Sequence, residues 1–151
     1  MTDGQRYELN EFFVHVFNQI LAWEGQTFKN ANVTDLSVRE LHIIDAIDNL
    51  TQSGKNTMAN VAKFLSVTPG ALTTAINTLV KKGYVERKYT NEDRRIIFVT
   101  ITEKGEAVNK IHSEYHKQMV EALDEVLDEE KLTVLLESLN KLGEFFKEKA
   151  K

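Results

Sequence analysis

Two short helical segments and a hairpin, packed into residues 57–102, are the feature that most constrains how this chain can fold. Thr57 is a suitable N-cap for the first helix, and only Ser66-Val67-Thr68 separates that helix from the second. Thr68 is again a good N-cap, and Pro69 suits a first helical turn because its missing N–H costs nothing there. Gly83 is a natural stop for the second helix, so the hairpin follows directly.

The hairpin is predicted from the stretch YVERKYTNEDRRIIFVTIT, residues 84–102, in which two runs of β-branched and aromatic residues flank a polar tip. Residues 81–95 carry six basic and three acidic side chains, whereas the whole chain has a formal net charge of −4. A local basic stripe on an acidic protein suits a site-specific contact with nucleic acid. The alternative is that these charges are only solvated surface.

Two helices joined by a tight turn and followed by a two-stranded ribbon predict a winged helix-turn-helix, in which the second helix enters the major groove. Leu72, Ile76 and Leu79 share one face of that helix and are predicted to be buried. The opposite face carries small polar residues, whose threonines can offer a hydroxyl or a methyl group and whose Asn77 can pair an adenine edge. Its members are Gly70, Thr74, Asn77 and Lys81, flanked by Thr73 and Thr78.

At the tip of the hairpin, two adjacent arginines follow an aspartate, and contact with DNA would explain this order. A narrow, negative minor groove attracts an inserted arginine, and Asp93 can accept a hydrogen bond from Arg95 and fix its direction. Arg94 can reach a phosphate. The predicted DNA-binding residues are therefore Thr57, Thr68, Gly70, Thr73, Thr74, Asn77, Lys81, Arg87, Asp93, Arg94 and Arg95.

Helical periodicity dominates the rest of the chain, so the predicted fold class is mainly α (α+β). We expect an amphipathic first helix over 7–28, a helix opened by a Ser37–Glu40 capping box, and the longest helix from Thr102 to about Val126. In the last helix the apolar intervals alternate three and four, the seam of a helix that packs on another helix. These apolar positions are Leu132, Leu135, Leu139, Leu142 and Phe146.

Composition excludes several classes of function. The chain has no cysteine, so disulfides, thiolate metal sites and cysteine-based oxidation sensing are excluded. It has no Gly-rich phosphate loop and no nucleophile within a recognisable motif, so we predict that it is not an enzyme and needs no cofactor. The N-terminus does not resemble a signal peptide and no apolar run is long enough to span a membrane, which predicts a soluble cytoplasmic protein.

Three stretches carry a resemblance to MarR-type transcriptional regulators: the LVKKGYVER exit from the second helix, the Asp93-Arg94-Arg95 wing, and the ITEKG entry to the long helix. The resemblance implies a single MarR-type domain over residues 1–151, with a DNA-binding core at 37–101 and dimerisation helices at 6–28 and 102–148. It also implies a homodimer that binds double-stranded DNA at a pseudo-palindromic operator, usually as a repressor controlled by a small ligand.

A narrower resemblance concerns the stretches VRELHIIDAI, TPGALTTAINTLVKKGYVER and IHSEYHKQMVEAL. They are similar to the fatty-acid-synthesis repressors of Gram-positive bacteria within the MarR family. This resemblance implies control of fatty-acid synthesis genes, with long-chain acyl-acyl carrier protein as the corepressor.

The histidines support a different effector. His112 and His116 are spaced i, i+4, which can chelate a metal, and His42 resembles a ligand of zinc-responsive family members, with Glu24 able to join it. The simpler interpretation is a group of hydrogen-bonded histidines near the dimer junction, without metal. Trp23 and Phe28, with the aromatic first helix, suggest a lipid pocket that would suit an acyl chain, against the simpler interpretation of core or dimer contact. The predicted effector pocket or junction comprises Trp23, Phe28, His42, His112 and His116, with a zinc-responsive or other small-ligand-responsive repressor as the alternative function.

Overall fold

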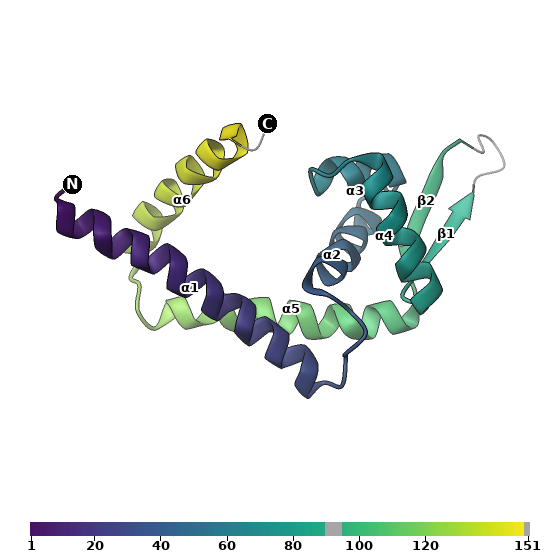
Figure 1. The fold of residues 1–151 in the computed structure, drawn as a ribbon, viewed down its shortest axis with the longest axis horizontal. Helices are drawn as coiled ribbons and strands as arrows, with labels where there is room; N and C mark the ends of the chain where they lie inside the picture. The colour runs from purple at the N-terminus through teal and green to yellow at the C-terminus, as the bar shows by residue number, and fades with distance from the viewer. Residues whose placement is uncertain (90–94, 150–151) are drawn as a thin grey trace. The chain divides into compact units, whose positions relative to one another are not determined.

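The computed structural model describes residues 1–89 and 95–149 and divides into two compact units, residues 1–115 and 116–151. The elements are α1 (Asp3–Asn30), α2 (Val38–Gln52), α3 (Met58–Phe64), α4 (Pro69–Lys82), β1 (Val85–Tyr89), β2 (Ile97–Ile101), α5 (Glu103–Asp124) and α6 (Glu129–Lys149) (Figure 1). This order confirms the predicted class, a mainly helical chain with a winged helix-turn-helix.

Local capping chemistry sets the helix boundaries of the winged helix-turn-helix. Ser37 and Glu40 form the predicted capping box at the start of α2. The hydroxyls of Thr57 and Thr68 accept the backbone N–H groups of Asn60 and Ala71, each at 3.2 Å, and so cap α3 and α4. Gly83 ends α4 at φ 82°, a left-handed conformation that glycine adopts without strain.

The core of the first unit lies where α2, α3 and α4 meet the base of the wing. Its most deeply buried side chains, each 0% exposed, are Ile44, Ile47, Val61, Ile76, Leu79 and Val99. The wing is an antiparallel pair in which Val85 faces Ile101 and Tyr89 faces Ile97. Val99, in the middle of β2, therefore anchors the ribbon in the same core as α4.

Gly105 makes the junction between the wing and α5 possible. A Cβ atom at this position would lie 2.4 Å from the backbone oxygen of Tyr84 and 3.0 Å from Cβ of Ile101. Only glycine permits this approach of α5 to the start of β1.

Two helix predictions were wrong. The longest helix is α1, with 28 residues against 22 in α5, because Thr2 and Gln5 form a capping box that starts α1 before Tyr7. At the other end of the chain α5 stops at Asp124, so Val126 lies beyond it, where its N–H donates to the Leu123 carbonyl at 3.1 Å.

The two terminal helices expose apolar side chains, each within its own unit. On α1, Phe12, Phe13 and Phe17 are 55%, 40% and 63% exposed. On α6, where none of the described side chains is buried, Leu139 and Phe146 are 49% and 54% exposed. Among the described residues, these helices and all others are too short or too polar to cross a membrane.

Candidate nucleic-acid interface

Helix α4 presents the two faces that its sequence predicts. Leu72, Ile76 and Leu79 are at most 1% exposed, whereas the side of the helix that carries Thr74 and Asn77 is exposed. The threonine hydroxyls donate backwards: Thr73 to the Pro69 carbonyl at 2.8 Å and Thr74 to the Gly70 carbonyl at 3.1 Å. Their hydrogens are therefore engaged within the helix, and each threonine offers a methyl group and an accepting oxygen to a ligand.

A side-chain hydrogen bond joins the recognition helix to the wing. Nη2 of Arg87, on β1, donates to Oδ1 of Asn77, on α4, at 2.7 Å. Both residues were predicted to bind DNA, but their contact with each other was not predicted. The bond brings a cation to the outward face of α4.

The wing is held to the helical core by a second set of bonds. Asn56, which is 6% exposed, accepts the Val99 N–H through its backbone oxygen at 2.9 Å and donates through Nδ2 to the Val99 carbonyl at 2.7 Å. Next to it, Thr57 forms a β-bridge with Phe98. The entrance to α3 therefore acts as a short third strand beside β2.

Arg95 lies in a shallow cleft between the wing and the two helices. The cleft has a volume of about 400 Å³ and is lined by Thr57, Met58, Ala59, Pro69, Thr73, Arg95, Ile96 and Ile97. Arg95 therefore shares this cleft with Pro69 and Thr73 of α4. The predicted partners Asp93 and Arg94 lie outside the described residues.

A polar network fixes the C-terminal end of α4. Nζ of Lys82 donates to Oε1 of Glu40 at 2.7 Å and to the backbone oxygen of Asp35. The Tyr84 hydroxyl donates to Oδ1 of Asp35 at 2.7 Å, and Lys104 lies 3.9 Å above the Tyr84 ring. The network ties α4 to the start of α2 and to the first turn of α5.

The network also changes the acidity of its two carboxyl groups. The bond from Tyr84 holds the pKa of Asp35 below its usual value, with help from Lys104 and Lys82. At Glu40, burial favours the neutral form, but the bonds from Lys82 and from the backbone and hydroxyl of Ser37 outweigh it and lower the pKa. Both groups are therefore held as carboxylates at neutral pH.

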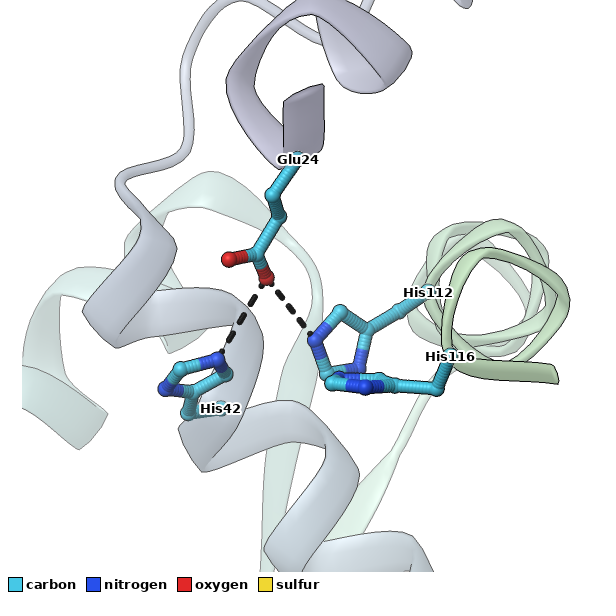
Figure 2. A group of neighbouring side chains, drawn as sticks. All are labelled: Glu24, His42, His112 and His116. Carbon is cyan, nitrogen blue, oxygen red and sulfur yellow. Dashed lines mark hydrogen bonds and ion pairs between the residues drawn. The ribbon is translucent and has the colours of Figure 1, made fainter. Parts of the chain in front are cut away.

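A second polar cluster is formed by Glu24 of α1, His42 of α2 and His112 of α5 (Figure 2). Glu24 and His112 are each 2% exposed, and Oε1 of Glu24 lies 3.0 Å from Nε2 of His112 and 3.4 Å from Nε2 of His42. His116 follows His112 by one turn of α5. A carboxylate and imidazole nitrogens are ligands that Zn²⁺ accepts.

The two aromatic residues of the predicted pocket lie near the cluster, and the Phe28 ring is 6.0 Å from the His112 ring between centroids. Phe28 is 3% exposed and belongs to the hydrophobic core. Trp23 is 41% exposed, and its ring packs edge-on against Tyr115 at 4.7 Å between centroids. Whether these residues serve an effector stays a prediction.

Comparison with known proteins places the chain in a family. The sequence profile of the MarR family matches residues 33–97. The crystal structure of Streptococcus pneumoniae FabT in complex with DNA superposes with a TM-score of 0.81, at 35% identity over 97% of this chain and 99% of that chain. The chain belongs to the MarR family.

Curated MarR-like relatives align over a shorter length. The uncharacterized HTH-type transcriptional regulator YwhA of Bacillus subtilis is 31% identical over 91 residues, and the transcriptional regulator ZitR of Lactococcus lactis is 27% identical over 95 residues. These alignments span 60% and 61% of this chain and 66% of each relative. Because the relatives are transcriptional regulators, the prediction that the chain is not an enzyme is confirmed.

Two residues that shape this MarR-type interface, Asn56 and Lys82, escaped prediction, and both act through partners more than 40 positions away. Arg87 was predicted to bind DNA, but its contact with Asn77, ten positions back across a turn, was not predicted. For Arg87 a signal existed, because alternation along β1 puts it on the same face as the apolar Val85. Asn56 and Lys82 carry no such periodic signal.

Proposed function

We propose that this MarR-family chain is a sequence-specific DNA-binding repressor that acts as a homodimer on a palindromic operator. The observation that carries the proposal is the exposed polar face of α4 beside Arg95, in a chain 35% identical to a protein solved in complex with DNA. Arg95 reads the minor groove while α4 lies in the major groove. Lys81, exposed in the last turn of α4, reaches a phosphate.

The homodimer accounts for the apolar surface of the terminal helices. Phe13 and Phe17 are exposed on α1, and Leu139 and Phe146 are exposed on α6. Exposed apolar area of this kind is stabilised by removal from water, and helices whose apolar residues repeat at three- and four-residue intervals bury them against other helices. Two copies also supply two recognition helices, which is what a palindrome requires.

Capture of sheared genomic DNA on the purified protein, followed by sequencing, tests this function. We expect enrichment of one palindromic sequence, with affinity that falls steeply as salt rises because several phosphates are neutralised per dimer. Arg95→Ala should weaken binding to that operator by about 1–3 kcal/mol. Wild-type affinity in Arg95→Ala, or a flat salt response, would contradict the proposal.

The proposed effector is a long-chain acyl-acyl carrier protein that acts as a corepressor on fatty-acid synthesis genes. The resemblance of VRELHIIDAI and IHSEYHKQMVEAL to fatty-acid-synthesis repressors supports it, together with the 35% identity to FabT. The test is titration of the captured operator with protein in the presence of acyl-loaded or unloaded carrier protein. The loaded form alone should tighten binding; equal affinities with both forms would reject this effector.

The cluster around Glu24 favours a second candidate, a zinc-responsive regulator. A buried carboxylate held by two imidazoles is a donor set suited to Zn²⁺, and the crystal structure of ZitR, 22% identical to this chain, is described as that of a zinc-responsive MarR family member. Glu24 and His112, with His42 and His116 as further ligands, would hold the ion. Bound zinc would fix α1, α2 and α5 to one another.

Calorimetric titration of the apo protein with Zn²⁺ separates the two candidates. Zinc regulation requires binding that His42→Ala and His112→Ala weaken, and operator affinity that rises with zinc. His15→Ala is the matched control, because His15 is an exposed histidine of α1 that bonds only to Glu11 in the described structure. Zinc that binds without any change in operator affinity would reject zinc as the effector.

A further inference from the structure

The hydrogen bond between Arg87 and Asn77 determines which atoms of Asn77 are available to DNA. A guanidinium has only donors, so the Asn77 atom 2.7 Å from Nη2 is the amide oxygen, Oδ1. The bond is charge-assisted, which makes it stronger than a bond between neutral groups. The Asn77 NH2 group therefore points away from Arg87, and among the described residues it has no acceptor.

The register of the wing explains why Arg87 turns toward α4. Arg87 lies directly opposite Val99 in the sheet, so both side chains project from the same face. Val99 is 0% exposed and anchored by Asn56, which fixes that face against the helical core. Arg87 is consequently half-buried and reaches the neighbouring recognition helix.

This arrangement changes the base that Asn77 can read. An asparagine recognises adenine by accepting from N6–H through its oxygen and donating to N7 through its nitrogen. At Asn77 a cation already occupies one side of Oδ1 and draws electron density from it, which weakens acceptance from a base. The same cation strengthens the NH2 donors, and the major-groove edge of guanine offers two acceptors, O6 and N7.

We propose that Arg87 is a specificity-determining residue that orients Asn77 as a donor, so that this position of α4 selects guanine over adenine. This inference rests on the DNA-binding function proposed above. It replaces the expectation from the sequence that Asn77 pairs with adenine. Arg87 thus has two tasks: its charge attracts DNA, and its geometry decides one base pair in each half of the operator.

Selection from a pool of random DNA duplexes, with sequencing of the bound fraction, tests the proposal. The proteins are wild type, Asn77→Ala, Arg87→Met and the control Lys88→Met, which removes a positive charge from the adjacent wing position. We expect wild type to favour guanine over adenine by about tenfold at one symmetry-related pair of positions, and Asn77→Ala to lose that preference. Arg87→Met should bind more weakly and accept adenine at the same positions, whereas Lys88→Met should bind more weakly without a change of base.

Each outcome bears on a definite claim. If Arg87→Met and Lys88→Met weaken binding and keep the same base preferences, Arg87 is only a phosphate contact and the inference is wrong. If wild type prefers adenine at the positions that Asn77→Ala disturbs, the inference is also wrong, while DNA binding stands. Failure of wild type to enrich any sequence would instead remove the proposed function and the inference with it. Thermal melting of Arg87→Met shows whether the variant is folded.

Discussion

The winged helix core buries its large apolar side chains, whereas the terminal helices leave many of theirs exposed. In the core, Ile44, Ile76 and Val99 are completely shielded by neighbours from the same chain, whereas Phe17 on α1 is 63% exposed and Phe146 on α6 is 54% exposed. Apolar burial stabilises a fold in proportion to the area removed from water. The core can therefore hold its shape within one chain, and the terminal helices carry apolar surface that a second copy would cover.

Ile76→Ala should produce the largest loss, because it opens a cavity at the centre of the self-contained region. We expect the free energy of unfolding to fall by about 2–5 kcal/mol. Val80→Ala on the same helix is the control, since Val80 is 37% exposed and should change stability far less. Chemical denaturation of both variants measures the difference, and equal losses would mean that the core is not organised around Ile76.

Phe17→Asp should weaken the dimer that the terminal helices are proposed to form and leave the winged helix core folded. A charge on the exposed apolar face of α1 should weaken self-association at least tenfold, or about 1.4 kcal/mol. Light scattering across a concentration series measures the change in dimer dissociation constant, with Asn18→Asp as a control at an adjacent exposed position. A dimer of unchanged affinity would place the interface elsewhere.

Thr68→Ala tests how far local capping stabilises the core. The Thr68 hydroxyl accepts the Ala71 N–H at 3.2 Å, and loss of such a cap costs about 1 kcal/mol. Thr78→Ala, which removes a hydroxyl in the middle of the same helix, should have a smaller effect on the melting temperature. A larger loss in Thr78→Ala would show that the back-bonded hydroxyls, and not the cap, stabilise α4.

Lys82→Met should give the smallest effect, at about 1 kcal/mol or less because the ion pair with Glu40 is partly exposed, and that effect should depend on pH. The folded-state pKa values of Asp35 and Glu40 lie below their usual 3.8 and 4.5, so their contribution to stability is present above those values and is lost as pH falls through the lowered ones. The difference in melting temperature between wild type and Lys82→Met should therefore be greatest near neutral pH and shrink in acid. A difference independent of pH, or an equal one in Lys81→Met, would contradict this role.

Features that depend on neighbouring residues could be predicted from the sequence, and features that depend on distant contacts could not. Caps and stops at Ser37, Thr57, Thr68 and Gly83 depend on neighbouring residues, so the element order and the fold class followed from local signals. The capping box at Thr2 and Gln5 was an equally local signal that was overlooked, which is why α1 was predicted too short.

The functional contacts depend on tertiary geometry and were less accessible. The bond between Asn56 and Val99 spans 43 positions, and no periodicity marks it. The outward face of α4 was predicted correctly, but the engaged Thr73 and Thr74 hydroxyls and the Arg87 bond to Asn77 required the packing of the wing on the helix. Residue type located the surface, and tertiary contacts determined the atoms that it presents.

The anchoring of β2 by Asn56 has a consequence for amide hydrogen exchange. A hairpin alone is marginally stable in water, so its amides would normally exchange through local fraying. The Val99 N–H, however, is held by the backbone oxygen of Asn56, at the entrance to α3. Its exchange should follow the opening of the helix-turn-helix itself, and the base of the wing should be as slow to exchange as the helices on which it rests.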